Sequence, residues 1–389
     1  MSVLESQVVP FHRALIEQEE IDAVLDVLNS GWLTTGPKTH EFEVAFARYL
    51  GASHALAVSS CTAALELALA AIGIQEGDEI ILPTMTFAAT GEVILHLKAV
   101  PVLVDCESST MHIAADEVER AITRRTRAII PVHYAGAPCD MDRLLEIGNR
   151  KDLRVIEDAA HALPTGYKNR LIGTLGDITC FSFYATKTLT TGEGGMATTE
   201  HEDYAERMRI LSLHGISKDA WKRYSAQGTW RYDIIEAGYK FNLTDMQAAL
   251  GLAQLAKCDA MCERRAAVAR RYTESLKSLD AFEVPRLPGN GTHSWHLYPI
   301  RINPPALRIH RDRVIEELKQ KGIGTSVHFI PLHLHSFYRT HFKCYAGQFP
   351  NAERFAEQAL SLPIFPSMTK DDVDRVIESL QEIARDFGR

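Results

Sequence analysis

The sequence lacks the marks of a secreted, membrane-bound or metal-binding protein. It has no CxxC pair and no apolar run long enough to span a membrane, and its first twenty residues are too polar and acidic for a signal peptide. Its seven scattered cysteines are typical of a reducing compartment. Cys258 and Cys262 lie one helical turn apart, which is only weak evidence for a metal site. We therefore expect a cytoplasmic protein without a metal centre.

Positive charge is also scarce. The 389 residues include 42 lysines and arginines against 50 aspartates and glutamates, which gives a net charge of −8. This balance argues against broad binding to nucleic acid or to an anionic membrane surface. The length and the hydrophobic content of 46% suit a globular protein with two domains or one large domain.

Short apolar segments alternate with segments of helical periodicity from about residue 54 to residue 200. The strand-like HALAVSS precedes the helical TAALELALAAIG, and DEIILPT precedes FAATGEVILHLKA. This alternation predicts an α/β fold with a mostly parallel sheet flanked by helices. Ligands of such sheets usually bind beyond the carboxyl ends of the strands, so we look for a site among the polar residues there.

The last third of the chain has a different character. A long helical segment is predicted over about residues 243 to 277, and turns, short strands and helices follow it. The chain ends in an amphipathic helix for which Thr369 is the predicted N-cap. We therefore expect a large domain over residues 1–255 and a smaller α+β domain over residues 256–389.

Two of the strand ends carry groups that suit a phosphorylated ring. Ser59 and Ser60 end a strand and Thr62 opens a helix, whose free N–H groups suit a phosphate, although an ordinary capped helix start has the same pattern. Asp158 ends another apolar strand, where a carboxylate needs a partner. It is either a structural cap or the partner of a protonated ring nitrogen, such as that of pyridoxal phosphate (PLP).

A third strand end carries Lys187, which follows the apolar segment CFSFYAT and precedes a glycine-rich stretch. Its ammonium could simply reach solvent. Alternatively it is a Schiff-base lysine, because desolvation disfavours the ammonium and exposes a nucleophilic amine. Ser182, five residues earlier, could donate its hydroxyl to a phosphate. A phosphate turn, Asp158, and Lys187 twenty-nine residues later together favour a PLP site.

Taken in order, these motifs resemble those of the DegT/DnrJ/EryC1/StrS family of sugar aminotransferases. These are PLP-dependent transferases of fold type I, the aspartate-aminotransferase-like fold, and the resemblance covers nearly the whole chain. The segments that carry it are SGWLTTGPKTHEFE, AVSSCTAAL, PTMTFAAT, PVHYAGAPCDMD, VIEDAAHA, FSFYATKTLTTGEGG, GYKFNLTDMQAALG, GIGTSVHFIPLH and LSLPIFPSMT.

The resemblance implies a role for each residue at a matching position. Lys187 would hold PLP through a Schiff base and later move the proton between cofactor and substrate. Asp158 would pair with the pyridine nitrogen, and His161 would lie close to the ring oxygen. Phe87 would stack on the pyridine ring. The phosphate contacts would be Cys61, Thr62 and Ser182.

One motif departs from the family pattern. The family often has G-x-N-Y-R, in which the Asn reaches the phosphate of the neighbouring subunit, whereas this chain has GYKFN from residue 238 to 242. Lys240 stands at the usual Asn position and Asn242 at the usual Arg position, so either could make that contact. The resemblance therefore implies a homodimer with shared active sites, in which Lys240 or Asn242 binds the partner's cofactor.

The resemblance also implies the reaction. L-Glutamate would give its amino group to a nucleotide-linked keto sugar, for the biosynthesis of cell-surface polysaccharide, lipopolysaccharide or glycan. The forms HYAGAP, GYKFN and SVHF look most like the branch that aminates C4 of UDP-linked 4-keto sugars, including the 4-amino-arabinose enzyme. Amination at C3 of a dTDP- or UDP-linked 3-keto sugar is the alternative. Candidate substrate contacts are Trp32, Thr34, Tyr184, Trp230, Arg231 and His328.

Three other classes share part of this pattern. A PLP-dependent sugar dehydratase of the family has a histidine where this chain has Lys187. A PLP-free Schiff-base lyase would need neither the phosphate turn nor Asp158. A non-catalytic PLP-binding regulator would be expected to carry a DNA-binding domain, and nothing in the sequence resembles one. The sequence therefore favours an aminotransferase.

Overall fold

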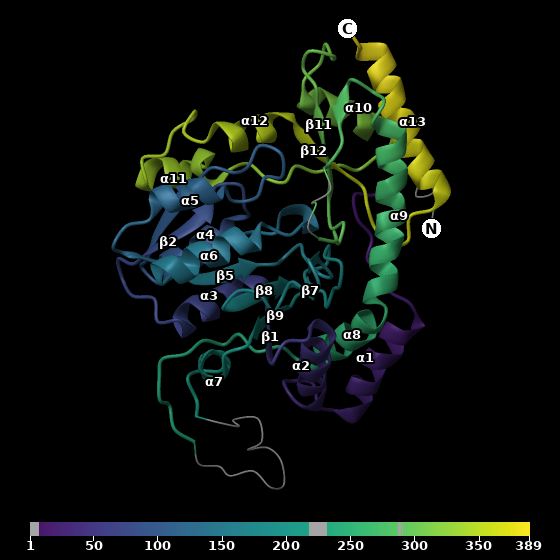
Figure 1. Ribbon diagram of the computed structural model, residues 1–389. Coiled ribbons are helices and arrows are strands. Elements are labelled where there is room, and N and C mark those ends of the chain that lie inside the picture. The colour runs from purple at the N-terminus through teal and green to yellow at the C-terminus, as the bar shows by residue number, and fades with distance from the viewer. Residues whose placement is uncertain (1–7, 218–231, 287–288, 290) are drawn as a thin grey trace.

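The computed structural model describes residues 8–217, 232–286, 289 and 291–389. Its main feature is a seven-stranded sheet in the order β1-β9-β8-β5-β4-β2-β3 (Figure 1). The strands are β1 (His54–Val58), β2 (Glu79–Pro83), β3 (Val100–Val104), β4 (Thr126–Ile129), β5 (Arg154–Asp158), β8 (Ile178–Ser182) and β9 (Gly195–Thr199). Only β9 runs antiparallel to its neighbours β1 and β8. The predicted α/β fold with a mostly parallel sheet is confirmed.

Helices cover both faces of this sheet because neighbouring residues of a strand point to opposite sides. Ile81 and Ile129 pack in one core, whereas Ile80 and Ala128 pack in the other. The first core contains residues of α2 (Pro37–Leu50), α5 (Ala115–Ala121) and α6 (Met141–Lys151), and the second those of α3 (Cys61–Ala71), α4 (Ala88–His96) and α7 (Glu202–Leu211).

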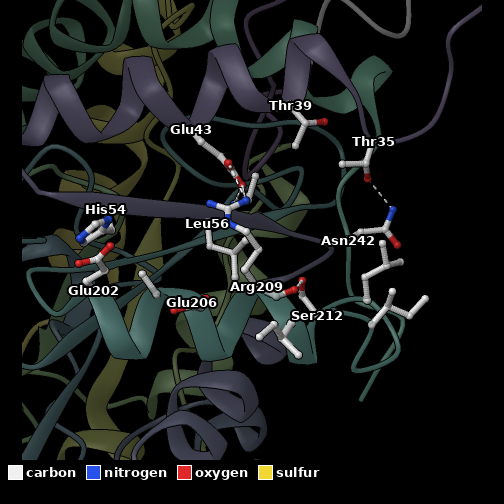
Figure 2. A pocket seen from close by; sticks show the side chains of 15 residues that line it. Thr35, Thr39, Glu43, His54, Leu56, Glu202, Glu206, Arg209, Ser212 and Asn242 are labelled. Carbon is white, nitrogen blue, oxygen red and sulfur yellow. Dashed lines mark hydrogen bonds and ion pairs between the residues drawn. The ribbon is translucent and has the colours of Figure 1, made fainter. Parts of the chain in front are cut away.

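The edge strand β1 is covered by an ion pair. Glu43 of α2 accepts the N–H of Ala57 at 2.9 Å, and Arg209 of α7 donates to Glu43 at 3.1 Å and to the carbonyl of Ala55 at 3.4 Å (Figure 2). The unpaired N–H and C=O groups of an edge strand can pair with strands of other molecules. The side chains of Glu43 and Arg209 hydrogen-bond to two of these groups on β1 and so prevent such pairing there. Burial raises the pKa of Glu43, while Arg209 and the N–H of Ala57 oppose that rise.

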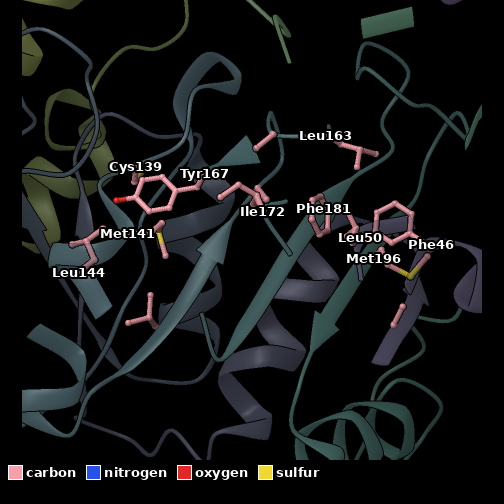
Figure 3. Close-up of a cluster of buried hydrophobic side chains, with 14 of the residues drawn as sticks. Phe46, Leu50, Cys139, Met141, Leu144, Leu163, Tyr167, Ile172, Phe181 and Met196 are labelled. Carbon is pink, nitrogen blue, oxygen red and sulfur yellow. The ribbon is translucent and has the colours of Figure 1, made fainter. Parts of the chain in front are cut away.

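The first core is closed at one end by aromatic side chains. The rings of Phe46 from α2 and Phe181 from β8 meet edge to face, with their centroids 5.2 Å apart (Figure 3). Phe42 and Phe183 extend this cluster, at 5.4 Å from each other. Cys180, Phe181 and Phe183 are therefore buried, as the sequence predicts, whereas Tyr184 and Ala185 directly ahead of Lys187 are exposed.

The helix predicted over about residues 243 to 277 is two helices. α8 (Asp245–Ala256) ends and α9 (Cys258–Leu276) begins at Lys257, whose φ of −115° and ψ of 13° are not helical. The ammonium of Lys257 lies 2.8 Å from carboxylate oxygens of Glu17 and Glu20, at the start of α1 (Gln18–Ser30). The break lets α8 pack against α1 and α2 while α9 packs against α13 (Lys370–Phe387) (Figure 1).

A separate core holds the C-terminal unit. It is built on a three-stranded sheet of β10 (Phe282–Glu283), β11 (Tyr298–Ile302) and β12 (Ala359–Leu362), together with α9, α10 (Arg311–Gln320) and α13. Thr369 caps α13 by accepting the N–H of Asp372, as predicted.

The chain passes between the two units more than once. Val9 packs in the C-terminal core. Leu332, and Tyr338 of α11 (Ser336–His341), pack instead with the large sheet. The division after residue 255 stays a prediction.

The remaining elements are β6 (Gly166–Tyr167), β7 (Arg170–Leu171), α12 (Pro350–Gln358) and the 3-10 helices η2 (Tyr134–Gly136) and η4 (Leu332–Leu334). None of the described helices combines the length and the apolar character needed to cross a membrane.

Candidate active site

A cavity of about 460 Å³ lies where β5, β8 and the start of α3 come together. The strands β5 and β8 are neighbours in the sheet and α3 packs against both, so residues distant in the sequence meet here. Nine residues that were predicted from the sequence line this cavity: Cys61, Thr62, Phe87, Asp158, His161, Ser182, Tyr184, Lys187 and His328.

The start of α3 provides an anion site. Ser60 caps the helix, because its hydroxyl accepts the N–H of Ala63 at 3.0 Å. Cys61 and Thr62 line the cavity, and their N–H groups precede the hydrogen-bond ladder of the helix. A Cβ on Gly195 of the adjoining strand would lie 2.6 Å from the nitrogen of Cys61, so only glycine allows this close approach. Together with the hydroxyl of Ser182, these N–H groups suit a phosphate.

Asp158 places a buried carboxylate at the end of β5. Its Oδ2 accepts the hydroxyl of Thr90 at 2.8 Å, and its Oδ1 accepts the N–H of Ala160 at 3.1 Å. Burial raises the pKa of Asp158, and these two hydrogen bonds and Lys187 oppose the rise. No ion pair to Asp158 forms within the part of the chain that the structure describes. A buried carboxylate in this state suits a cationic partner such as a protonated ring nitrogen.

Lys187 brings a half-buried amine to the same cavity. Desolvation lowers the pKa of Lys187 to about 8, against the opposing effects of Cys61 and Asp158. The backbone N–H of Lys187 donates to the carbonyl of Tyr184 at 2.9 Å, which turns the chain at the end of the strand. An amine with a lowered pKa is partly unprotonated near neutral pH, as a nucleophilic lysine requires.

His161 presents a neutral imidazole. Its Nδ1 accepts the N–H of Ala135 at 3.3 Å, so the neutral ring carries its proton on Nε2. Burial, together with Lys187 and His328, lowers the pKa of His161 well below its usual value. The Nε2–H group is thus a donor for an oxygen of a bound ring, such as that of PLP.

Lys240 and Asn242 do not line the cavity of Lys187. Asn242 lines a second cavity of about 340 Å³, between α2, β1 and α7, and its amide donates to the hydroxyl of Thr35 at 2.7 Å (Figure 2). The ammonium of Lys240 contacts the side-chain oxygen of Asn242. These residues therefore lie outside the cavity of Lys187 in their own chain.

The remaining predicted substrate contacts also lie elsewhere. The indole N–H of Trp32 donates to the carbonyl of Thr35 at 3.2 Å, and the carbonyl of Thr34 accepts the N–H of Asp245 at 3.2 Å. These bonds fix the N-terminal loop on the start of α8. Trp230 and Arg231 lie outside the described residues.

Several polar residues of the cavity were not predicted from the sequence, among them Thr90 and His296. Thr90 lies in the quoted segment PTMTFAAT, and its hydroxyl is 2.7 Å from that of Thr86, one helical turn earlier. This spacing of two threonines, one before the helix α4 and one in its first turn, was the available signal. His296 lies two residues before the start of β11 and lines the cavity. No spacing in the sequence relates it to Lys187, so only the fold brings it to the cavity.

A family model described as the DegT/DnrJ/EryC1/StrS aminotransferase family matches residues 14–381. The chain belongs to this family. It is 54% identical over 381 residues to the uncharacterized protein MJ1066 of Methanocaldococcus jannaschii, with 98% of each chain covered. It is 48% identical over 377 residues to the spore coat polysaccharide biosynthesis protein SpsC of Bacillus subtilis, with 97% of each covered.

A solved structure of a putative sugar aminotransferase agrees with the fold. The putative sugar aminotransferase Spr1654 of Streptococcus pneumoniae, in its PLP form, has a TM-score of 0.91 at 35% identity, over 97% of this chain and 99% of that chain. The same protein has also been solved in a PMP form. The predicted aspartate-aminotransferase-like fold is confirmed.

Proposed function

We propose that the chain transfers the amino group of L-glutamate to C4 of a UDP-linked 4-keto sugar. The chain is an aminotransferase by family, and its cofactor is PLP. When bound, PLP supplies the electron sink that allows an amino group to leave one carbon and join another. The observation that carries this proposal is the placement of the desolvated Lys187 amine and the buried Asp158 carboxylate in one cavity with the start of α3.

Each group of the cavity has a task in this reaction. Lys187 holds the cofactor covalently at rest, and its free amine then carries a proton to and from the reacting carbon. Its lowered pKa suits both tasks, because the amine can accept a proton and give it up near neutral pH. Asp158 keeps the ring nitrogen protonated, and His161 donates its Nε2–H to the ring oxygen.

The phosphate and the ring face have their own contacts. The N–H groups of Cys61 and Thr62 and the hydroxyl of Ser182 hold the phosphate at the start of α3. Phe87 covers one face of the ring. These groups bind and orient the cofactor, so that the amine of Lys187 is kept beside the reacting carbon.

A second copy of the chain completes this site. Phe87 is 62% exposed and Tyr184 is 47% exposed, although both line the cofactor cavity. A two-fold partner that covers them would also bring Lys240 or Asn242 of the partner subunit to the phosphate. An ammonium beside a phosphate is strongly favoured once water is excluded.

Helix α1 offers apolar surface for such a partner. Ile21, Leu25 and Leu28 are each between 46% and 49% exposed, and their spacing places them on one face of the helix. Exposed apolar patches of this kind are typical of interfaces. We propose that the partner protomer is a second copy of this chain, which these exposed residues would help to bind.

The choice of substrate rests on the sequence forms HYAGAP, GYKFN and SVHF. The last of these places His328 and Phe329 in the cavity wall. We assign the substrate contacts to Trp32 and Thr34 of the N-terminal loop and to Tyr184 and His328 of the cavity. The sequence adds Trp230 and Arg231, which lie outside the described residues.

The setting is the cytoplasmic synthesis of a cell-surface polysaccharide or glycan. The relative SpsC is named for polysaccharide biosynthesis. All seven cysteines of this chain are free thiols, which suits a reducing compartment. An enzyme there would meet nucleotide-linked sugars before they are assembled.

The test is an assay of the PLP-loaded protein with L-glutamate and a panel of UDP-, dTDP- and GDP-linked 4-keto and 3-keto sugars. Mass spectrometry identifies the amino sugar, and NMR locates its nitrogen. The expected product is a UDP-linked sugar aminated at C4. Amination only at C3, or only of dTDP sugars, would contradict the proposed substrate. A PLP-loaded protein that aminates no sugar would favour a non-catalytic regulator.

A further inference from the structure

Two loops that are distant in the sequence meet at one buried carboxylate. The N-terminal loop, residues 31–36, leads into α2, and the GYKFN loop, residues 238–242, leads toward α8. The carboxylate belongs to Asp245, the first residue of α8, which is 2% exposed. The first loop carries proposed substrate contacts, and the second carries the proposed contacts to a cofactor phosphate.

The carboxylate of Asp245 accepts four hydrogen bonds from the start of α2. Its Oδ1 accepts the N–H of Gly36 at 2.8 Å, and both the N–H and the hydroxyl of Thr39, at 2.9 Å and 2.7 Å. Its Oδ2 accepts the N–H of Lys38 at 3.1 Å. The N–H groups at the start of a helix have no partner within the helix, so Asp245 caps α2 from a position 206 residues beyond Thr39.

Helix α2 has no side-chain cap of its own. Ser60 caps α3 and Thr369 caps α13, but the N-cap residue of α2 is Gly36. A Cβ on Gly36 would lie 2.9 Å from Oδ2 of Asp245 and 2.0 Å from Nε1 of Trp32, so only glycine allows this close approach. The start of α2 therefore depends on a carboxylate that belongs to α8.

Further hydrogen bonds run between the two loops. The N–H of Asp245 donates to the carbonyl of Thr34 at 3.2 Å. The amide of Asn242 donates to the hydroxyl of Thr35 at 2.7 Å, and this hydroxyl donates to the carbonyl of Leu243 (Figure 2). The N-terminal loop and the GYKFN loop are thus held together as one unit.

We propose that Asp245 is a positioning residue that fixes the two loops as one unit, and that this unit completes the active site of the partner subunit. The inference rests on the proposed composite site, in which Lys240 or Asn242 reaches the cofactor of the other protomer. If the GYKFN loop serves that site, the N-terminal loop serves it too, because Asp245 holds both.

The first experiment compares amide hydrogen exchange of Asp245→Asn and wild type, in the cofactor-free protein. Whichever way the amide of the asparagine turns, its NH2 group faces an N–H group of α2. Loss of these bonds predicts exchange that is about 5- to 10-fold faster at Gly36, Lys38 and Thr39. The N–H of residue 245 should also exchange faster, because its acceptor Thr34 lies in the loosened loop. Wild-type exchange at either end would overturn the joint fixing.

The matched control is Asp105→Asn. Asp105 is also buried, and its carboxylate accepts the N–H groups of Asn351 and Ala352 at the start of α12, each at 3.0 Å. This variant should speed exchange at the start of α12 and leave both loops within about twofold of wild type. Faster exchange of the loops in both variants would show a general loss of stability and would overturn the inference.

A milder variant keeps the inference testable if Asp245→Asn does not fold. Thr39→Val removes only the hydroxyl donor and leaves the three N–H groups in place. Exchange at the start of α2 and at Asp245 should then rise by about 2- to 5-fold. Wild-type exchange at these positions would overturn the role of the carboxylate.

The second experiment shows which subunit the unit serves. Lys187→Ala and Asp245→Asn are unfolded, mixed and refolded, and amino transfer is compared with that of each parent refolded alone. In a mixed dimer, one site takes Lys187 from the Asp245→Asn chain and both loops from the other chain, so it carries no defect. When half the dimers are mixed, about a quarter of all sites are intact. Activity no higher than the mean of the two parents would overturn the inference, because the defect would then stay within its own chain.

A parallel mixture separates this inference from the proposed function. It combines Lys187→Ala with the double variant Lys240→Ala and Asn242→Ala. Recovery there, without recovery for Asp245→Asn, would overturn the role of Asp245 and leave the composite site standing. Recovery in neither mixture would overturn the composite site and this inference together. A wild-type protein that binds no PLP would overturn the proposed function, and hydrogen exchange would still decide whether Asp245 fixes both loops.

Discussion

The hydroxyl of Thr90 donates a 2.8 Å hydrogen bond to Oδ2 of Asp158. Thr90 is fully buried at the start of α4, and its hydroxyl also lies 2.7 Å from that of Thr86. Burial raises the pKa of Asp158 and the hydrogen bond from Thr90 opposes that rise. Thr90 therefore helps to keep the carboxylate ionised, as the proposed contact of Asp158 with the ring nitrogen of PLP requires.

Replacing Thr90 should weaken cofactor binding. In Thr90→Val the pKa of Asp158 rises further. As the pH falls, this variant should therefore lose its affinity for PLP at a higher pH than the wild-type protein does. A hydrogen bond to a charged group predicts about a 10-fold or larger increase in the Kd for PLP. Fluorescence titration measures the Kd for PLP between pH 5 and pH 8, in steps of roughly half a pH unit.

Two further variants calibrate this result. Thr90→Ser retains the hydroxyl and should stay close to wild type, whereas Asp158→Ala should bind PLP more weakly than Thr90→Val and turn over far more slowly. Equal affinities of Thr90→Val, Thr90→Ser and wild type would show that this hydroxyl does not support Asp158.

The amine of Lys187 should react at lower pH than an ordinary lysine. Its pKa is lowered to about 8, so in the cofactor-free protein its reactivity should rise with pH and level off above that value. A free lysine analogue, with a pKa of about 10.4, continues to rise over the same range. Competitive labelling with acetic anhydride measures the reactivity of Lys187 and of the analogue in one sample. Mass spectrometry of the peptide that contains Lys187 reads out the labelling. A Lys187 profile parallel to that of the analogue would contradict the desolvated amine.

Mixed dimers should recover activity that neither parent has. One parent is Lys187→Ala, and the other combines Lys240→Ala with Asn242→Ala. If Lys240 or Asn242 serves the partner subunit, a mixed dimer has one site with both defects and one with none. When half the dimers are mixed, about a quarter of all sites are intact, and activity should return toward that level.

The measurement is to unfold, mix and refold the two parents, and to compare the activity with that of each parent refolded alone. Native mass spectrometry verifies that mixed dimers form. Absence of recovery in such a preparation would mean that Lys240 and Asn242 serve their own subunit or do not touch the cofactor.

The ion pair over the sheet edge should matter for stability rather than for chemistry. Glu43→Leu leaves the N–H of Ala57 and the guanidinium of Arg209 without their acceptor (Figure 2). An unsatisfied buried donor costs about 1–3 kcal/mol, so the Tm of the cofactor-free protein should fall by several degrees. Glu43→Gln keeps an acceptor for the N–H of Ala57, so its Tm should fall by less than that of Glu43→Leu. Equal Tm values for the two variants would contradict the claim that an acceptor for the N–H of Ala57 stabilises the sheet edge.

Much of the site could be predicted from the sequence because it lies at strand ends. Asp158, Ser182 and Lys187 each follow an apolar segment, and a parallel sheet brings such positions to one edge. Their chemistry is visible in the residue type, since a carboxylate or an amine after a buried strand needs a partner.

The features that were missed depend on contacts between distant parts of the chain. Thr90 bonds to a residue 68 positions away, and His296 meets His161 only because the C-terminal unit packs over the large sheet. The break at Lys257 has no glycine or proline to mark it, and the helical pattern continues across it. Its ion pairs with Glu17 and Glu20 exist only in the folded chain, where they offset the lost helical hydrogen bonds.

Covalent trapping of the cofactor tests whether Lys187 is the residue on which the whole reaction depends. The PLP-loaded protein is reduced with sodium borohydride, which fixes the cofactor to the lysine that holds it, and is then digested and examined by tandem mass spectrometry. Lys187→Ala is treated in parallel and assayed for amino transfer from glutamate. We expect the pyridoxyl mass on Lys187 alone in wild type, and neither this modification nor amino transfer in the variant. A pyridoxyl group on another lysine, or turnover near wild type in Lys187→Ala, would contradict the assignment.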